Sequence, residues 1–232
     1  MNKAQQQGIS AVLFDLDGVI TDTAKYHFEA WKQLADELGF HFDREFNEQL
    51  KGIDRMASLE KILSQLPNGG AAFTLDQKQE WADRKNSHYQ RLIQTVDESE
   101  ILPGILELFH DLKQAGIPMG LASASRNAGT LLRQLKVESY FNVVINPESL
   151  VHGKPAPDIY LKAAEELGVD PSYCVGVEDA EAGVQAIKSA GMFAVGVGDA
   201  EILSKADYIV AETSKLSLSE ICLAIEEKDD LA

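Results

Sequence analysis

Short apolar runs that alternate with helical segments place the strongest limit on how this chain can fold. The runs occupy residues 11–14, 119–122, 143–145, 173–177 and 193–197. Each run has the length of a strand that is buried on both faces of a sheet. Between the runs, apolar residues recur at helical spacing, as in residues 157–167 before Gly168. This alternation predicts an α/β fold with a Rossmann-like, doubly wound parallel sheet.

One long segment breaks the alternation and predicts an inserted helical domain. Helical patterns without an apolar strand between them occupy residues 24–38, 56–66 and 75–94. Thr74 and Gln77 have the spacing of a capping box, which predicts a helix start at this point. We therefore expect a small α-helical cap domain at 23–97 and an α/β core domain at 1–22 and 98–232. An insert in this position lies over the carboxyl ends of the strands, where open α/β folds bind ligands.

Charge and composition exclude several classes of protein. The chain has 21 Lys and Arg against 37 Asp and Glu, a net charge of −16, which disfavours non-specific binding to nucleic-acid phosphates. It contains no apolar run of about 18 residues, and its first ten residues are polar, so we expect neither a membrane span nor a signal peptide. Cys174 and Cys222 do not form a CxxC pair, which argues against a disulfide framework and favours a cytoplasmic location.

Two acidic pairs follow apolar runs. Asp15 and Asp17 stand two residues apart after the first run, and Glu178 and Asp179 directly follow residues 173–177. Because parallel strands end at one edge of a sheet, we expect these four carboxylates to converge. Carboxylates this close repel each other unless a raised pKa or a cation relieves the repulsion, and hard oxygen ligands suit Mg²⁺. The alternatives are a turn-forming pair at the first site and a helix N-cap at the second.

Two further segments carry groups that can bind phosphate. Ser123, Ala124 and Ser125 follow the run 119–122 where a helical segment begins, so a hydroxyl and backbone N–H groups can face an anion there. Lys154 precedes a proline, which favours extended backbone and holds the lysine outside the helix that follows. An acidic protein can bind a phosphorylated small molecule where a metal ion and a few cations converge.

The motifs FDLDGVITDT, SAS, GKPAPD and GVEDA, in this order and spacing, resemble the signature motifs of the haloacid dehalogenase superfamily. The resemblance covers essentially the whole chain and extends into the insert at FDLDGVITDTAKYHFEAW, FNEQLKGIDRMASLEKIL and DRKNSHY, which are similar to the small cap of its phosphomutase members. It implies an isomerase that interconverts β-D-glucose 1-phosphate and D-glucose 6-phosphate, with β-D-glucose 1,6-bisphosphate as intermediate and activator.

The resemblance also implies the roles of individual core residues. Asp15 is the expected nucleophile, which forms an aspartyl phosphate, and Asp17 is the expected general acid and base. One Mg²⁺ is expected at the Asp15 carboxylate, the Asp17 backbone carbonyl and Asp179, with Glu178 close by or ligating. The residues implied to stabilise the transferring phosphoryl group are Ser123, the Ala124 backbone and Lys154.

A second phosphate on a sugar bisphosphate needs a separate binding site. Arg55 in the insert is implied to bind it through its guanidinium, and Ser125 and Asn127 lie near enough to assist. Thr23 and Lys51 are expected to hold the acid–base carboxylate out of line until the cap closes.

The remaining insert residues match positions that line the sugar or organise closure. They are His27, Trp31, Lys51, Gly52, Ser58, Lys85 and Asn86. Without the resemblance, His27 has the alternative reading of a structural histidine, Trp31 of cap core, Ser58 of cap surface, and Lys85 of an exposed helix charge.

Two rival functions use the same features. A sugar-phosphate phosphatase shares the first half-reaction, because water can replace the sugar as the phosphoryl acceptor. A non-catalytic sugar-phosphate sensor keeps the fold but does not require Asp15, Asp17, Lys154 or Asp179. We expect a sugar phosphate as the partner, no nucleic acid, no membrane and, because the cap must move, a monomer.

Overall fold

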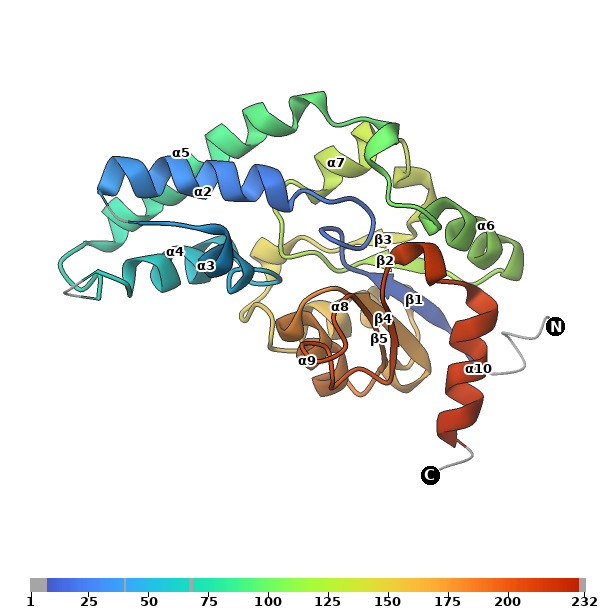
Figure 1. Ribbon diagram of the computed structural model, residues 1–232. Helices are drawn as coiled ribbons and strands as arrows, with labels where there is room; N and C mark the ends of the chain where they lie inside the picture. The colour runs from blue at the N-terminus through green and yellow to red at the C-terminus, as the bar shows by residue number, and fades with distance from the viewer. Residues whose placement is uncertain (1–7, 40, 67–68, 230–232) are drawn as a thin grey trace.

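A parallel sheet forms the centre of the larger part of the molecule (Figure 1). The computed structural model describes residues 8–39, 41–66 and 69–229, and within them the sheet has six strands in the order β3-β2-β1-β4-β5-β6. The strands are β1 (Ala11–Phe14), β2 (Met119–Leu121), β3 (Val143–Val144), β4 (Cys174–Glu178), β5 (Phe193–Val197) and β6 (Tyr208–Val210). This order is that of a doubly wound sheet, as the sequence predicts. The edge strand β6 is an addition that the sequence analysis did not predict.

The burial and the register of the strands determine which residues emerge together at one edge of the sheet. Every residue of β1, β4 and β5 is buried, which matches their continuous apolar sequences. Phe14 at the end of β1 pairs with Leu121 of β2 and with Val177 of β4. The residues that follow these three strands therefore emerge side by side at one edge of the sheet.

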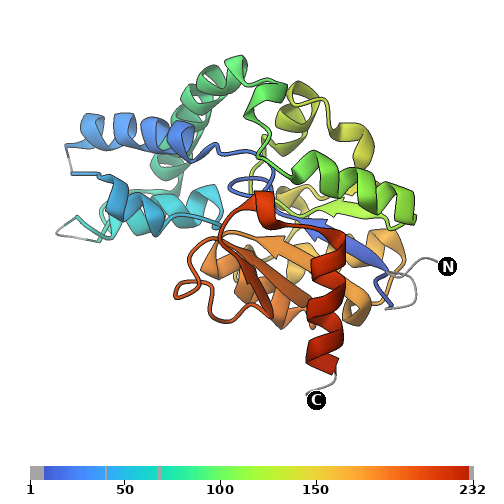
Figure 2. The same ribbon diagram turned by 45° about the vertical axis from the view of Figure 1, so that its right-hand side comes forward.

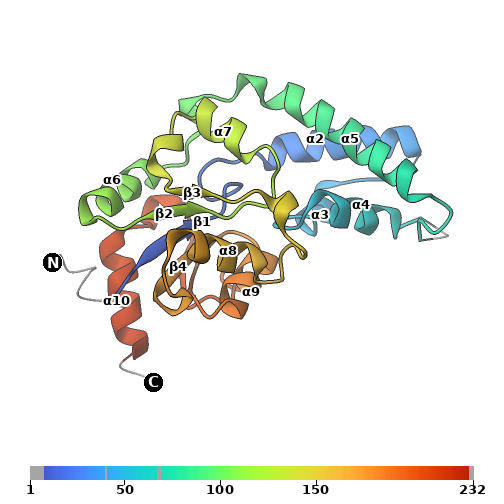
Figure 3. The same cartoon turned by 180° about the vertical axis from the view of Figure 1, so that it is seen from behind.

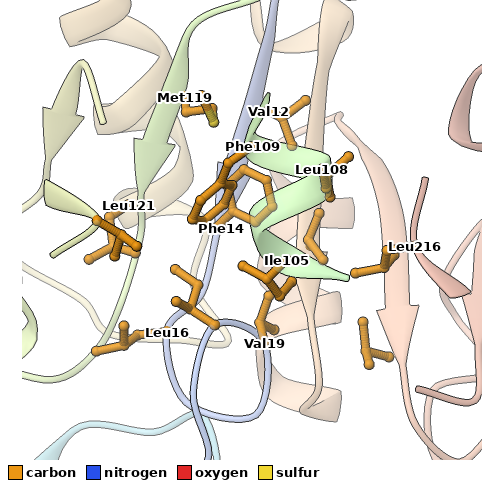
Figure 4. Packing of buried hydrophobic residues seen from close by; sticks show 14 of the residues in the cluster. Val12, Phe14, Leu16, Val19, Ile105, Leu108, Phe109, Met119, Leu121 and Leu216 are labelled. Atoms are coloured by element: carbon orange, nitrogen blue, oxygen red, sulfur yellow. The ribbon is translucent and has the colours of Figure 1, made fainter. Parts of the chain in front are cut away.

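Helices cover both faces of the sheet (Figures 2 and 3). Helices α6 (Ile105–Ala115), α7 (Ala128–Gln134) and α10 (Leu218–Asp229) pack on one face, and α8 (Asp158–Leu167) and α9 (Glu181–Ser189) pack on the other. On the first face, Phe14 meets Phe109 edge to face at 5.2 Å between ring centroids (Figure 4). The buried side chains of the two faces thus fix the ends of the strands in a rigid frame.

The four α-helices that the structure describes between β1 and α6 in the sequence form a separate layer. They are α2 (Ala24–Leu38), α3 (Arg44–Glu48), α4 (Arg55–Leu63) and α5 (Leu75–Leu92). Their buried residues, among them Trp31, Leu34, Leu59 and Ile62, make a hydrophobic cluster distinct from the two clusters at the sheet. Figure 1 shows these helices beside the end of the sheet from which the β1–α2 loop emerges. We call residues 23–97 the cap and the rest the core; the boundaries of this division stay a prediction.

The helix boundaries in the cap agree with the sequence patterns in most places. Helix α2 spans the predicted residues, and Thr74 and Gln77 form the predicted capping box at the start of α5. Helix α4 ends at Leu63 rather than at residue 66. The short helix α3 was not predicted, and Asp43 caps it by accepting a hydrogen bond from the Phe46 N–H.

Short 3₁₀ helices complete the secondary structure. They lie at Ile93–Thr95, Glu98–Glu100, Glu138–Tyr140, Pro147–Ser149, Pro171–Tyr173 and Thr213–Lys215. Within residues 8–39, 41–66 and 69–229, none of the helices combines the length and the hydropathy that crossing a membrane requires.

Candidate active site

A cavity of about 960 Å³ lies where the cap meets the end of the sheet, and both parts line it. Thr23 and Glu178 do not line it, but each bonds to a residue that does: Thr23 to Asp17 and Glu178 to Lys154. The predicted site residues that line the cavity are Asp15, Asp17, His27, Trp31, Lys51, Gly52, Arg55, Ser58, Lys85, Asn86, Ser123, Ala124, Ser125, Asn127, Lys154 and Asp179. The fold therefore brings together residues that lie far apart in the sequence.

Asp15 stands at the floor of the cavity in a buried ionic cluster. The Lys154 Nζ lies 2.7 Å from Asp15 Oδ1 and 2.5 Å from Glu178 Oε1. Asp15 and Lys154 are each only 4% exposed, and Glu178 is fully buried. Burial alone would lower the pKa of Lys154, but the negative charges of Asp15 and Glu178 hold it well above the usual value. Lys154 is thus a fixed positive charge beside the Asp15 carboxylate.

Three carboxylates at this edge could hold a metal ion. Oxygen atoms of Asp15, Glu178 and Asp179 lie within 4.8 Å of one another. Burial, followed by the charges of Glu178 and Asp15, raises the pKa of Asp179 well above its usual value. A carboxyl group with this shift gains from a nearby cation, and a hard oxygen set of this kind fits a divalent ion such as Mg²⁺.

Asp17, the fourth carboxylate of the predicted set, bonds to Thr23. Among the described residues, Asp17 is not part of the three-carboxylate cluster; its carboxylate accepts a hydrogen bond from the Thr23 hydroxyl, and Oδ2 lies 3.7 Å from His27 Nε2. The chain leaves the extended conformation after Phe14, and Gly18 turns with a positive φ of 77°. A side chain at Gly18 would collide with the Asp179 carboxylate, so the turn needs glycine. Asp17 thus lies at the same edge as the other three carboxylates, and its charge acts on Asp179, but its side chain bonds to Thr23 and lies outside the three-carboxylate cluster.

The Asp17 carboxyl group is suited to proton transfer. Burial, then the charge of Asp15, raises its pKa to about 7, while the hydrogen bond from Thr23 opposes the shift. The Asp17 backbone N–H donates to Asp15 Oδ2 at 3.0 Å, which fixes the loop between the two acids. A group with a pKa near neutrality can both give and take a proton at physiological pH.

Next to Asp17, the partly exposed His27 pairs with the buried Lys85. Lys85 is 5% exposed, and its Nζ lies 2.7 Å from His27 Nδ1 and 4.7 Å from the centre of the Trp31 ring. Burial, then the charge of Arg55, lowers the pKa of Lys85 to about 7. Burial, then the charge of Lys85, lowers the pKa of His27 well below its usual value. The reading of Lys85 as an exposed helix charge is therefore wrong.

Trp31 and Ser58 serve the cap structure as well as the cavity wall. Trp31 packs in the cap cluster, and the Ser58 hydroxyl donates to the Asp54 carbonyl at 2.9 Å. Ser58 is only 3% exposed, so its reading as cap surface is wrong.

Two cationic residues of the cap that line the cavity, Arg55 and Lys51, are paired with acids of the cap. Arg55 is the first residue of α4, and its Nη1 lies 3.3 Å from Asp83 Oδ1. The Lys51 Nζ lies 2.7 Å from Glu48 Oε2. At Gly52, a Cβ atom would lie 2.8 Å from the Ala180 Cβ, so this loop of the cap touches the core. The cap loop that carries Lys51 and Gly52 therefore lies against the core residue that follows Asp179.

The serine motif lies beside a polar contact between cap and core. Ser123 is 1% exposed, and its Oγ accepts a hydrogen bond from the Ser125 N–H at 3.1 Å. The Asn127 Nδ2 donates to Asn86 Oδ1, and the Gln90 Nε2 donates to Asn127 Oδ1, both at 2.9 Å. Asn127 and Asn86 therefore join the two parts.

The structure adds residues that sequence reasoning missed. The Tyr160 hydroxyl donates to Glu178 Oε1 at 3.3 Å, and its ring lies 5.2 Å from Lys154 Nζ. Arg126 and Glu148 both line the cavity and form an ion pair of 2.7 Å. The position of Arg126 between two motif residues was a signal, whereas nothing in the sequence indicated Tyr160 or Glu148.

The sheet order, the buried lysine beside an aspartate that follows β1, and the second acidic motif after β4 define a class of enzyme core. A family profile described as a haloacid dehalogenase-like hydrolase matches residues 9–191. The chain belongs to the haloacid dehalogenase-like family, as its motifs predict.

Particular relatives share most of the chain. It is 52% identical to the β-phosphoglucomutase of Bacillus subtilis over 212 residues, which cover 90% of this chain and 92% of the relative. The crystal structure of a β-phosphoglucomutase from Clostridium difficile matches with a TM-score of 0.93 and 44% identity, covering 96% of this chain and 99% of that one. A CbbY variant from Rhodobacter sphaeroides, solved with xylulose-(1,5)bisphosphate, matches with a TM-score of 0.78 and 25% identity, covering 91% and 98%.

Proposed function

We propose that this chain catalyses the β-phosphoglucomutase reaction. It interconverts β-D-glucose 1-phosphate and D-glucose 6-phosphate, with β-D-glucose 1,6-bisphosphate as the intermediate and activator. The observation that carries the proposal is the pairing of Asp15 and Lys154 under a cap whose Arg55 lines the same cavity. The similarity to the Bacillus subtilis enzyme over most of the chain supports the same reaction.

Asp15 is the proposed nucleophile. An oxygen of its carboxylate attacks the phosphorus of the bisphosphate, the bond from phosphorus to the sugar oxygen breaks, and an aspartyl phosphate forms. In the return step, a hydroxyl of the bound sugar monophosphate attacks this aspartyl phosphate and frees the Asp15 carboxylate. The 1- and 6-positions take turns as donor and acceptor, which isomerises the sugar phosphate.

Asp17 is the proposed general acid and base. It gives its proton to the sugar oxygen that leaves phosphorus, and it takes the proton of the hydroxyl that attacks in the return step. Its pKa of about 7 suits both directions of transfer. Thr23, His27 and Lys85 hold the Asp17 side of the cavity and control the direction in which its carboxylate points.

Lys154, Ser123 and the Ala124 backbone are proposed to stabilise the phosphoryl group as it transfers. Charge spreads over the three equatorial oxygens of that group, and donors that are already in place stabilise it without reorganisation. Lys154 meets this requirement because two buried carboxylates fix its ammonium group.

The acidic cluster is the proposed magnesium site. The ligands would be the Asp15 carboxylate, the Asp17 backbone carbonyl and the Asp179 carboxylate, with Glu178 close by. A bound Mg²⁺ supplies charge neutralisation on the phosphoryl oxygens. Glu178 is oriented by Lys154, Tyr160 and the N–H groups of Asp179 and Ala180, so its main part is to position Lys154.

The cap is proposed to select the sugar phosphate and to exclude water. Arg55 binds the phosphate that is not transferring, with Ser125 and Asn127 beside it. The residues proposed to line the sugar or organise closure are Trp31, Lys51, Gly52, Ser58 and Asn86. Exclusion of water matters because the aspartyl phosphate would otherwise hydrolyse before the bisphosphate reorients.

Three further expectations, on the domains, the oligomeric state and the compartment, accompany the proposal. The cap and core act as domains with boundaries at residues 23 and 97. The protein works as a monomer, because closure needs only one chain's cap and core. Its compartment is the cytoplasm, in agreement with two buried free cysteines, Cys174 and Cys222.

A two-channel assay tests the function. The protein is incubated with Mg²⁺, β-D-glucose 1-phosphate and a trace of β-D-glucose 1,6-bisphosphate, while D-glucose 6-phosphate and free phosphate are followed in one tube. We expect glucose 6-phosphate to form with little phosphate. Release of phosphate in step with loss of substrate would show a phosphatase, and binding without turnover would show a sensor.

A further inference from the structure

An ion pair with no part in the proposed function stands in the wall of the cavity. Arg126 follows the serine motif, and Glu148 lies in the 3₁₀ helix Pro147–Ser149 that precedes the Lys154 loop. Arg126 Nη1 and Glu148 Oε1 are 2.7 Å apart, and their side chains are 35% and 49% exposed. Both residues line the cavity, so a ligand there meets this pair directly.

Arg126 and the cap arginine, Arg55, both line the cavity and interact electrostatically. The pKa of Arg55 is lowered first by burial and then by the positive charge of Arg126, whereas Asp83 and Glu148 act in the opposite direction. Two guanidinium groups, one from the cap and one from the core, thus share one region of the cavity wall. Within the described part of the chain, Arg55 forms its ion pair with Asp83 and Arg126 forms its ion pair with Glu148.

The two acids differ in position. Glu148 lines the cavity, and Asp83 is not among its lining residues. A ligand phosphate can therefore approach Arg55 without meeting Asp83, but it meets the Glu148 carboxylate when it approaches Arg126. Two anions compete for one guanidinium, and the exposed ion pair is weak enough for a phosphate dianion to displace.

We propose that Glu148 is a selectivity residue, a resident counter-ion of Arg126 that the second phosphate of a sugar bisphosphate must displace. This inference rests on the proposed function, and it assigns to Glu148 a charge that opposes binding of the bisphosphate. Glu148 weakens the binding of the bisphosphate and so promotes its release. A small ester with one phosphate, which reaches only Asp15 and Lys154, does not experience this competition.

The test compares the unmodified protein with Glu148→Gln, which keeps the side-chain shape and removes the charge. For equilibrium dialysis every protein, the reference included, also carries Asp15→Asn, so that no phosphoryl group transfers and the dissociation constant of β-D-glucose 1,6-bisphosphate can be measured. An acetyl phosphate assay, without Asp15→Asn, measures reaction at the core. We expect the bisphosphate dissociation constant to fall about three- to tenfold, as expected for removal of one competing charge near a partly exposed site. The rate with acetyl phosphate should change less than about twofold, because this donor does not reach Arg126.

Glu98→Gln is the matched control. Glu98 pairs with Lys136 at 2.8 Å and is 53% exposed, so its loss changes the net charge equally at a similar ion pair outside the cavity. We expect no change in bisphosphate binding for this variant. In an Arg126→Gln background, the gain from Glu148→Gln should disappear, because the guanidinium for which the anions compete is gone.

The outcomes separate this inference from the proposed function. If the reference protein binds the bisphosphate and Glu148→Gln leaves the affinity unchanged or weakens it, Glu148 does not compete and the inference alone is overturned. A gain of equal size in Glu98→Gln would also overturn it, since net charge would then be the cause. If the reference protein binds no bisphosphate, the proposed function and this inference both fall.

Discussion

The core and the cap each bring charge to the cavity, but they hold it in different ways. At the core, Lys154 pairs with both Asp15 and Glu178, and all three residues are at most 4% exposed. In the cap, Arg55 and Lys51 pair with Asp83 and Glu48, whose side chains are 58% and 60% exposed. The core charges are therefore fixed before any ligand arrives, whereas Arg55 and Lys51 of the cap have solvated partners.

The difference assigns separate tasks to the two regions. A buried, fully paired network does not need to reorganise when charge develops on a transferring phosphoryl group, which is the condition for electrostatic catalysis. An exposed ion pair contributes little to stability, so a phosphate can replace its acid at small cost. We infer that the core carries the chemistry and that the cap determines which phosphate ester reaches it.

Loss of the nucleophile should have the largest effect. In Asp15→Asn the side chain keeps its size but cannot form an aspartyl phosphate, so turnover of β-D-glucose 1-phosphate should fall by about a thousandfold or more. The two-channel assay measures it, and circular dichroism checks the fold. Residual turnover within tenfold of the unmodified protein would place the nucleophile elsewhere.

Removal of the core cation should reduce stability strongly. Lys154→Met leaves Asp15 and Glu178 buried without their cation, and breaking a buried pair in this way costs about 3–5 kcal/mol of unfolding free energy. Urea unfolding in the presence of a metal chelator measures the change. Lys162→Met is the matched control, because Lys162 forms only exposed pairs on α8 and should shift the unfolding free energy by less than about 0.5 kcal/mol. Equal effects for the two variants would contradict the contrast between buried and exposed pairs.

Removal of the cap cation should change selectivity and spare the fold. For Arg55→Ala we expect kcat/KM with β-D-glucose 1-phosphate to fall about 10- to 100-fold, because a bidentate phosphate contact is lost. The ratio of free phosphate to glucose 6-phosphate should rise, while reaction with acetyl phosphate should stay within about twofold. A similar loss with both substrates would show that Arg55 acts on the chemistry rather than on selection.

An ion cluster of the core that does not line the cavity should show the smallest effect and a defined pH dependence. Asp207 is partly desolvated, which raises its pKa, but the Ala194 N–H, Lys188 and Lys228 together hold the pKa below its usual value. A lowered pKa stabilises the folded state above the unfolded-state pKa of about 4, and this stabilisation disappears as the pH falls through the folded-state pKa. Asp207→Asn should therefore lose about 1–2 kcal/mol at pH 7.

The pH series for Asp207→Asn uses urea unfolding of both proteins. The difference in unfolding free energy should be constant from about pH 5 to 7 and shrink below about pH 4. A difference that grows as the pH falls would show that the carboxylate is not stabilised by its cations.

The sequence was sufficient for the fold class, and most of the residues that it singles out line one cavity. Continuous apolar runs identify strands that are buried on both faces, and chain order then places the residues after residues 14, 121 and 177 at one edge. Strand β6 (Tyr208–Val210), at the edge of the sheet, was missed. Its pattern does not differ from that of an apolar loop segment.

The sequence could not predict how individual side chains of the site are used. The direction of Asp17 depends on the turn at Gly18, where the Asp179 carboxylate leaves no room for a side chain. The burial of Lys85 depends on α2 packing against α5, which buries one face of a helix that is polar nearly all round. Both results come from contacts between segments that are distant in sequence.

The most direct test of the account follows the phosphoryl group itself. The protein is mixed with radiolabelled β-D-glucose 1,6-bisphosphate and Mg²⁺, a sample is quenched, and the label is mapped by peptide digestion; unlabelled β-D-glucose 1-phosphate is then added to the remainder. If the core carries the chemistry and the cap excludes water, the label appears on the peptide that contains Asp15 and passes to the sugar. Label that never reaches Asp15, or that passes from it to free phosphate in preference to the sugar, would contradict the account.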